Sequence, residues 1–286
     1  MSDEAHSDTG QQQWGSSAEA WVRAAEEEET GASASATKWM LGAAELQPGD
    51  HVLELACGAA RVGLQVAEKV QPTGTVLCSD FSPGMVEAVE ARIARADIAN
   101  TEARVLDAQE LDLEAESFDV VLCRFGYMLM ADPLRALRES CRVLRPGGRL
   151  VLAVWGTAEK NPWLGTIANA VMDQLCAPPP EPGTPGPFAL GEPAHLHEML
   201  GKAGLVEVDA VEIATEQTYE SLDGWWEQLR EVSGPLAALL DALPTTEAEA
   251  IKAAAFAASR EYVQTGGKVV FPATVVGAKA ERSRRG

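Results

Sequence analysis

Basic residues are scarce in this sequence of 286 residues. It carries 23 lysines and arginines against 43 aspartates and glutamates, which gives a formal net charge of −20. Such a charge repels the phosphates of nucleic acids and anionic membrane surfaces, so neither is expected as a partner. No apolar run reaches the ~18 residues needed to cross a bilayer. The polar, acidic N-terminus also lacks the apolar segment of a secretory signal.

Cysteine is also uncommon, and its spacing excludes two kinds of framework. There are five cysteines, an odd number, with no CxxC pair and no Cys/His cluster: Cys57, Cys78, Cys123, Cys141 and Cys176. This pattern matches neither a zinc site nor the disulfide framework of a small secreted domain. We therefore expect no metal site, and reduced thiols in a cytoplasmic protein.

Strands and helices are expected to alternate in the first half of the chain. Apolar segments predict strands at 52–56, 75–79, 102–106, 118–123 and 149–155, with helices at about 60–70, 83–96 and 133–144. This alternation is typical of βαβ units, whose right-handed crossovers place helices on both faces of a parallel sheet. The predicted fold class is α/β, with a doubly wound, Rossmann-like core over residues 47–156.

Two regions flank this core. Residues 1–46 are expected to form a disordered tail, over 1–13, followed by an N-terminal helical lid. Residues 157–286 form the C-terminal part. It is expected to begin with a loop rich in proline and glycine at 157–187 and a helix at 192–203. Two strands are expected at 205–213 and 268–279, with a helical stretch between them at 221–264. The late strands predict an antiparallel edge pair with a helical cap inserted before the last strand. The sheet is then mostly parallel and has seven strands.

Small residues follow the first strand, at the edge of the sheet where ligands of doubly wound folds bind. Residues 56–60 read Ala-Cys-Gly-Ala-Ala and let a ligand come close to the backbone. The loop lacks the GxGxxG spacing, and Ala60 stands where a third glycine would be. It therefore suits a nucleoside better than a dinucleotide, whose pyrophosphate needs those glycines.

Aspartates end the second and third strands. Asp80 can accept hydrogen bonds from both hydroxyls of a ribose. Ser82 and Pro83 already suit a helix start, which leaves Asp80 free for that role. Asp107 has two interpretations: it accepts from an exocyclic amine such as that of adenine, or it is a solvated loop residue.

Four ordered segments resemble the class I S-adenosylmethionine-dependent methyltransferases, and within them the small-molecule group of the ubiquinone and menaquinone C-methyltransferases. They are VLELACGAAR (52–61), VLCSDFSPGMVEAV (76–89), DAQELDLEAESFDVVLCRFGYMLMADP (107–133) and ALRESCRVLRPGGRLVLAVWG (136–156). The resemblance implies S-adenosylmethionine as cofactor and S-adenosylhomocysteine as product. Ala56 and Ala60 depart from a pattern that often has glycine at both positions, and the methyl group of Ala60 narrows the loop.

The resemblance also implies which residues hold the cofactor. Their roles divide among its amino group, its methionine part, its ribose and its adenine. In that order they are Glu54 at the amino group, Cys123, Arg124 and Phe125 along the methionine part, Ala56 and Gly58 admitting the methionine part and ribose, Asp80 on the ribose hydroxyls, and Phe81, Met85, Asp107, Ala108 and Gln109 around the adenine.

The expected reaction needs little catalytic machinery. Methyl transfer from a sulfonium is an in-line displacement that depends on positioning and exclusion of water. The sequence accordingly shows no Ser-His-Asp or paired-carboxylate motif. A base matters only for a phenol or an acidic carbon. Tyr127 and His195 are the candidates, and each has a structural alternative: Tyr127 as a core residue, His195 as a surface residue.

Four tryptophans lie in the segments expected to cover the strand ends: Trp14, Trp21, Trp225 and Trp226. Together with Tyr127 they either line the pocket of a flat or apolar acceptor or pack the cap onto the core. We expect a small aromatic, quinone-like or polyketide-type acceptor from secondary metabolism, methylated on carbon or oxygen by a monomer or homodimer. Two alternatives stay open: a protein that binds the cofactor but catalyses another reaction such as a cyclisation, and a binding protein without catalysis.

Overall fold

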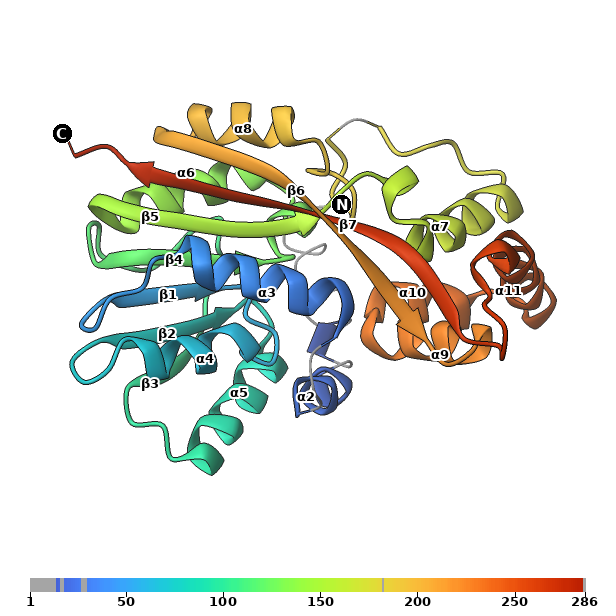
Figure 1. Cartoon of the computed structure of the whole chain (residues 1–286), viewed down its shortest axis with the longest axis horizontal. Coiled ribbons are helices and arrows are strands. Elements are labelled where there is room, and N and C mark those ends of the chain that lie inside the picture. Colours follow the sequence, from blue (N-terminus) through green and yellow to red (C-terminus); the bar gives the residue numbers. More distant parts are fainter. Residues whose placement is uncertain (1–13, 16–17, 27–29, 182, 285–286) are drawn as a thin grey trace.

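A seven-stranded sheet forms the centre of the molecule in the computed structural model, which describes residues 14–15, 18–26, 30–181 and 183–284 (Figure 1). The tail expected at 1–13 lies outside the described residues. The strand order is β3-β2-β1-β4-β5-β7-β6. The strands are β1 (His51–Leu55), β2 (Thr75–Asp80), β3 (Thr101–Val105), β4 (Phe118–Arg124), β5 (Leu144–Trp155), β6 (Leu205–Tyr219) and β7 (Val269–Arg282).

The predicted mixture of strand directions is confirmed. Strands β1 to β5 pair in parallel, whereas β7 runs antiparallel to both β5 and β6. From β1 the chain builds the sheet outward through β2 and β3, and then restarts on the other side with β4. The order therefore reverses between β1 and β4, and the carboxyl ends of these two strands form the topological switch point where ligands bind in open α/β sheets.

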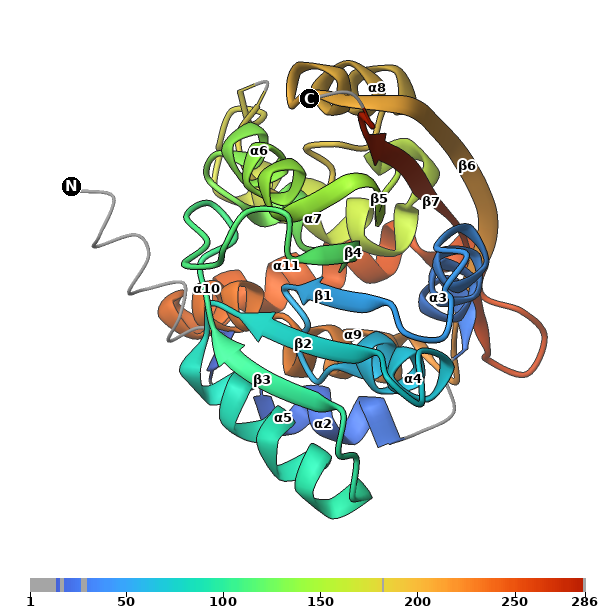
Figure 2. The ribbon, with the colours of Figure 1, turned by 90° about the vertical axis from the view of Figure 1, so that its left-hand side faces the viewer.

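Helices cover both faces of the sheet (Figure 2). On one side lie α3 (Gly31–Ala43), α4 (Arg61–Lys69) and α5 (Pro83–Ala96), and on the other α6 (Pro133–Val143) and α8 (Pro193–Lys202). Proline at the first turn starts α5, α6 and α8, where its missing N–H costs no hydrogen bond. The central strands of the sheet are apolar and buried, with all of Val120–Cys123 inaccessible to solvent.

Four further helices stand at the carboxyl end of the sheet, and we name them the cap: α7 (Pro162–Gln174), α9 (Leu222–Val232), α10 (Gly234–Ala242) and α11 (Thr245–Ala258). The last three confirm the helical stretch expected at 221–264. The first corrects the loop expected at 157–187. Trp163, Ile167 and Ala170 are buried along one face of α7, and this helical spacing was obscured by the prolines and glycines at 178–187.

Strand β6 is longer than its sequence pattern predicted. It was expected to end at 213, but it pairs with β7 as far as Tyr219 and Val269. Beyond Ile213 many residues of β6 are polar and this part of the strand is half exposed. Its composition therefore does not predict a strand. The chain that joins the paired ends of β6 and β7 forms the cap helices α9, α10 and α11. Among the described residues, no helix is long and apolar enough to cross a membrane.

Candidate active site

The Asp80 carboxylate organises the loops that follow β1 and β2. Its Oδ2 accepts the backbone N–H of Gly58 at 3.0 Å and its Oδ1 accepts the N–H of Ser82 at 3.0 Å. Ser82 and Pro83 start α5 as expected, although the Ser82 side chain makes no capping bond and its backbone N–H bonds to Asp80 instead. A carboxylate has about four acceptor positions, so these bonds leave room to accept from hydroxyl groups of a ligand.

Burial makes this carboxylate costly to ionise. Asp80 is only 6% exposed, and burial raises its pKa, an effect that the amides of Ser82 and Gly58 partly offset. A hydrogen-bond donor brought by a ligand would stabilise the charged form further. The site is therefore suited to a group with two hydroxyls, such as a ribose.

Left-handed backbone conformations cluster at the switch point. Ala56, Gly58 and Ala60 have φ angles of 49°, 52° and 52°, and Phe125 at the end of β4 has a φ of 60°. Such angles cost a residue with a side chain about 1–2 kcal/mol, and they gather at functional sites. Ala60 thus adopts a left-handed conformation that glycine, the residue common at this position in the family pattern, would adopt more easily. A Cβ at Gly58 would meet no atom within 4 Å, so the loop has open space beside its backbone.

Glu54 lies beneath this loop, on the side of the sheet that α4 covers. It is 3% exposed, and its Oε2 accepts the N–H of Gly63 at 2.8 Å. Burial raises the pKa of Glu54 to about 7, although the positive charge of Arg124 acts in the opposite direction. The Arg124 guanidinium in turn donates to the Thr37 hydroxyl at 2.7 Å. The buried Glu54 carboxyl and the half-buried, positively charged Arg124 guanidinium therefore interact at the carboxyl ends of β1 and β4.

The close fit of Gly63 against Glu54 leads to a stability prediction. A Cβ at Gly63 would lie 2.4 Å from Glu54 Oε2 and 2.5 Å from Cys78 Sγ. We expect Gly63→Ala to destabilise the fold by about 2–3 kcal/mol in urea unfolding, because neither buried neighbour has room to move. Gly201→Ala, in a helix where a Cβ meets nothing, should instead stabilise it by about 0.5–1 kcal/mol. Equal effects of the two substitutions would contradict this packing.

The loop after β3 is held rigidly by its own side chains. Asp107 Oδ1 accepts the backbone N–H of Gln109 at 2.8 Å, and Gln109 Oε1 accepts the N–H of Asp132 at 2.7 Å. Asp107 itself is exposed, whereas Ala108 is 7% exposed. Met85 of α5 is buried and Phe81 is half-buried. This loop and the start of α5 therefore follow neighbouring strand ends, as expected for a nucleobase site.

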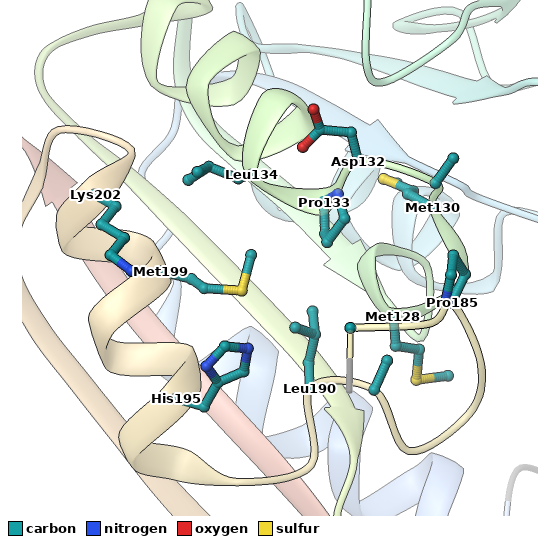
Figure 3. Close-up of a pocket in the computed structure, with 13 residues that line it drawn as sticks. Met128, Met130, Asp132, Pro133, Leu134, Pro185, Leu190, His195, Met199 and Lys202 are labelled. Atoms are coloured by element: carbon teal, nitrogen blue, oxygen red, sulfur yellow. The ribbon is translucent and has the colours of Figure 1, made fainter. Parts of the chain in front are cut away.

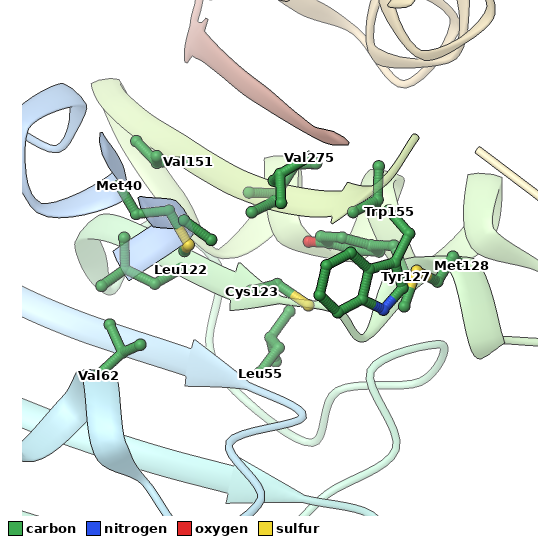
Figure 4. Close-up of a cluster of buried hydrophobic side chains, with 14 of the residues drawn as sticks. Met40, Leu55, Val62, Leu122, Cys123, Tyr127, Met128, Val151, Trp155 and Val275 are labelled. Atoms are coloured by element: carbon green, nitrogen blue, oxygen red, sulfur yellow. The ribbon is translucent and has the colours of Figure 1, made fainter. Parts of the chain in front are cut away.

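An aromatic stack marks the ends of β4 and β5. The rings of Phe125 and Trp155 lie parallel, with centroids 4.0 Å apart and an interplanar angle of 9°. Trp163 of α7 meets Trp155 edge-on at 4.9 Å. Sequence reasoning missed Trp155, although its place as the last residue of a strand was a usable signal. The Cys123 side chain, near the end of β4, is fully buried in the apolar core (Figure 4).

Tyr127 belongs to the core and not to the site, which corrects its proposed catalytic and acceptor-binding roles. Its ring is fully buried, and its hydroxyl lies 2.6 Å from the Ser140 hydroxyl of α6. Burial raises the pKa of Tyr127 well above its usual value, so its hydroxyl stays protonated and cannot take up a proton as a base. His195, the other candidate, is exposed on α8, on the opposite side of the sheet from Glu54.

Two of the four tryptophans also belong to packing. Trp225 is fully buried and donates through Nε1 to the Trp163 carbonyl at 2.8 Å, and Trp226 is 4% exposed. Both pack against Phe256 within the cap. Of the two alternatives given for them, the structure therefore favours packing of the cap over the acceptor wall.

The N-terminal tryptophans lie elsewhere. Trp14 and Trp21 are half-buried, and Trp21 Nε1 donates to the Val232 carbonyl at 3.1 Å. The adjacent Gly15 approaches Gly84 at the start of α5, where a Cβ on Gly84 would be 3.4 Å from the Gly15 Cα. This segment therefore passes over the carboxyl end of β2.

Together, the sheet order, the loop after β1 and the acidic residue ending β2 define the class I S-adenosylmethionine-dependent methyltransferases. The sequence profile of a methyltransferase domain matches residues 46–199, more than half of the chain. The chain belongs to this methyltransferase family. Among the described residues, no cluster of histidine, cysteine, aspartate and glutamate is suited to a metal ion.

Comparison with known proteins supports the same class. The chain is 38% identical over 105 residues to a demethylmenaquinone methyltransferase of Listeria monocytogenes, a match that covers 37% of this chain and 44% of that one. A demethylmenaquinone methyltransferase of Lactococcus lactis is 38% identical over 103 residues, covering 36% and 41%. The chain thus matches less than half the length of these curated relatives.

Solved structures share the fold over a longer stretch. The YcgJ protein of Bacillus subtilis superposes with a TM-score of 0.63 at 20% identity, covering 88% of this chain and 99% of that one. The [4+2]-cyclase SpnF superposes with a TM-score of 0.54 at 18% identity, covering 86% and 80%. At such identities the likeness establishes the fold alone.

Proposed function

We propose that this protein transfers the methyl group of S-adenosylmethionine to a small molecule with an aromatic, quinone-like or polyketide-type ring. The observation that carries the proposal is the Asp80 carboxylate, held by the Gly58 and Ser82 amides beside open space in the first loop. That geometry provides what a nucleoside needs: acceptors for two hydroxyls and a backbone that can be approached closely. The loop carries no triple-glycine cradle for a pyrophosphate.

The residues around Asp80 fit the rest of the cofactor. We assign the ribose to Asp80, the adenine to the surface between the start of α5 and the loop after β3, and the amino-acid end to Glu54 and Arg124. The cofactor supplies a methyl group on a positively charged sulfur. Glu54 and Asp80 place negative charge under that region when ionised, and Arg124 gives a partner for a carboxylate.

The acceptor is assigned to the Phe125–Trp155 stack. Two parallel rings at the ends of β4 and β5 offer a flat, apolar wall next to the loop that holds the cofactor. Because Tyr127 lies in the core and its pKa is raised, it cannot serve as the base for methyl transfer. An acceptor acidic enough to lose its proton to solvent before methyl transfer would then need only positioning and exclusion of water.

We also propose that α2 (Ala18–Glu26) acts as a lid over the cofactor. Its residues reach three elements around the carboxyl end of the sheet. Trp21 bonds to the end of α9, the Arg61 guanidinium at the start of α4 donates to the Ala24 carbonyl, and Glu26 pairs with Arg95 of α5. A bound cofactor would leave only after these contacts open.

The lid makes a kinetic prediction. Trp21→Phe keeps an aromatic ring but removes the donor to Val232, and we expect S-adenosylhomocysteine to dissociate about fivefold faster, in line with the loss of one hydrogen bond. Stopped-flow fluorescence measures this rate. Arg23→Gln removes an exposed ion pair with Glu231 at 3.5 Å and should change the rate less than twofold. Identical rates in all three proteins would contradict the lid.

The test of the function combines binding with product mass. Isothermal titration should detect S-adenosylhomocysteine binding in the micromolar range, typical of a cofactor site. Incubation with S-adenosylmethionine and a panel of naphthoquinols, flavonoids and polyketide lactones should then give a product heavier by one methyl group. A product of unchanged mass would favour cyclisation or another reaction, and binding without any turnover would favour a non-catalytic protein.

The cellular setting is part of the proposal. All five cysteines are unpaired thiols, three of them buried, as suits a reducing compartment. We place the protein in the cytoplasm, in secondary metabolism, as a monomer or homodimer without a nucleic-acid or membrane partner.

A further inference from the structure

A pocket of about 280 Å³ opens between α6, α8 and the chain segment 183–190 (Figure 3). Its wall is made largely of aliphatic side chains, prolines and thioethers. The apolar lining residues are Met128, Met130, Ala131, Pro133, Leu134, Pro185, Ala189, Leu190 and Met199. Three of the seven methionines of the chain therefore face this one space. Methionine side chains adapt to apolar ligands of different shape.

The charged groups of the pocket are already paired within the protein. Asp132 Oδ1 accepts the backbone N–H of Arg135 at 2.9 Å, and Lys202 Nζ pairs with Glu198 at 2.7 Å. His195 stands exposed at the rim of the pocket. The pocket thus presents no buried charge to a ligand, so an uncharged hydrocarbon fits it better than an acid or an amine.

The pocket adjoins the proposed acceptor site. Met128 lines the pocket and follows Phe125, a ring of the aromatic stack, by three residues (Figure 3). The segment that closes the pocket is bound to the same edge of the sheet, since the Gly186 N–H donates to the Met128 carbonyl at 2.9 Å. A Cβ at Gly191 would lie 2.7 Å from the carbonyl carbon of Gly156, just after β5.

We infer that this pocket binds a hydrocarbon tail carried by the acceptor, while the ring of the acceptor lies against the Phe125–Trp155 stack. Met128, a buried residue of the pocket wall, is the side chain that we expect to turn aside to let the tail pass. The inference rests on the proposed function, because it assigns the pocket to the methyl acceptor. A space of 280 Å³ corresponds to about nine water-sized groups, which sets the length of tail that it holds.

The methionines make a direct test available. With 13C-labelled methionine methyl groups, Met128, Met130 and Met199 report on the pocket and Met85 on the cofactor site, while Met40 and Met172 lie outside both. In protein saturated with S-adenosylhomocysteine, 1-octanol should shift the three pocket signals saturably and leave Met40, Met85 and Met172 in place. Octanoate, which carries a charge, should bind at least about tenfold more weakly.

Two matched variants locate the effect. Leu134→Trp fills the pocket from a half-buried position and should weaken 1-octanol binding about tenfold or more. Leu239→Trp makes the same change on α10, at a leucine that is 36% exposed, and should leave binding unchanged. Unmoved pocket signals, shifts that persist in Leu134→Trp, or reversal of the Met85 shift by 1-octanol would overturn the inference.

The same samples separate the two proposals. If S-adenosylhomocysteine fails to shift Met85, the proposed function fails, and the assignment of the pocket to a methyl acceptor fails with it. If Met85 shifts and the pocket signals do not respond to 1-octanol, the tail pocket alone is wrong.

Discussion

Asp80→Asn should lower the affinity for S-adenosylhomocysteine about 100-fold or more, which corresponds to roughly 2.7 kcal/mol. The side chain keeps its size, but its amide nitrogen cannot accept. One of the two backbone amides, Gly58 or Ser82, then faces a donor in place of an oxygen. The loop loses its alignment and the ribose loses a charge-assisted partner at the same time. Isothermal titration of the variant and the wild type measures the change.

Asp107→Asn provides the matched control for this prediction. Asp107 is exposed and its contacts are to Gln109, two residues along the same loop, so we expect a loss of affinity below about tenfold. Circular dichroism should show both variants folded. If Asp80→Asn binds within threefold of the wild type, Asp80 does not hold the nucleoside and the site must be placed elsewhere.

Glu54 should make the stability of the fold depend on pH. Burial raises its pKa from 4.5 to about 7 in the folded protein, so the folded state holds a proton that the unfolded state releases between these values. The free energy of unfolding therefore falls as the pH rises from about 4.5 to 7 and changes little above that range. The shift of ~2.5 units corresponds to at most about 3 kcal/mol.

Glu54→Gln should remove this dependence. Glutamine accepts the Gly63 N–H through its side-chain oxygen but cannot ionise. The free energy of unfolding of the variant minus that of the wild type should therefore rise by about 2–3 kcal/mol between pH 5 and pH 8, measured by urea unfolding. Glu102→Gln, on the exposed face of β3, should follow the wild-type curve. Parallel curves for the wild type and Glu54→Gln would mean that Glu54 is ionised in both states.

Much of the fold was predictable because it depends on local patterns. Apolar segments separated by turn residues predicted all seven strands, and the proline-initiated helices between them followed from the same reading. Parallel strands joined by right-handed crossovers must bring their carboxyl ends to one edge. That rule places residues 56–60 and Asp80 at one edge of the sheet from the sequence alone.

The interior of the cap was decided by contacts between distant parts of the chain. The sequence places Trp225 and Trp226 in a helical stretch without saying what they face, and contacts with α7, α11 and β7 bury them. The same packing selects helix over loop for residues 162–174. A tryptophan has the same sequence signature in a ligand wall and in a core, because both need a large apolar ring.

The chemistry at the strand ends divides in the same way. The sequence by itself determined the class of fold, the place of the cofactor loop and the acidic residue that ends β2, since each follows from strand order and residue type. Only the tertiary structure decided that Asp80 holds two amides, that Tyr127 turns into the core and that Phe125 stacks on Trp155. Apart from the Ser82 amide, these depend on side-chain direction and on neighbours 13 or more positions away in the chain, such as Ser140 for Tyr127, which no local pattern records.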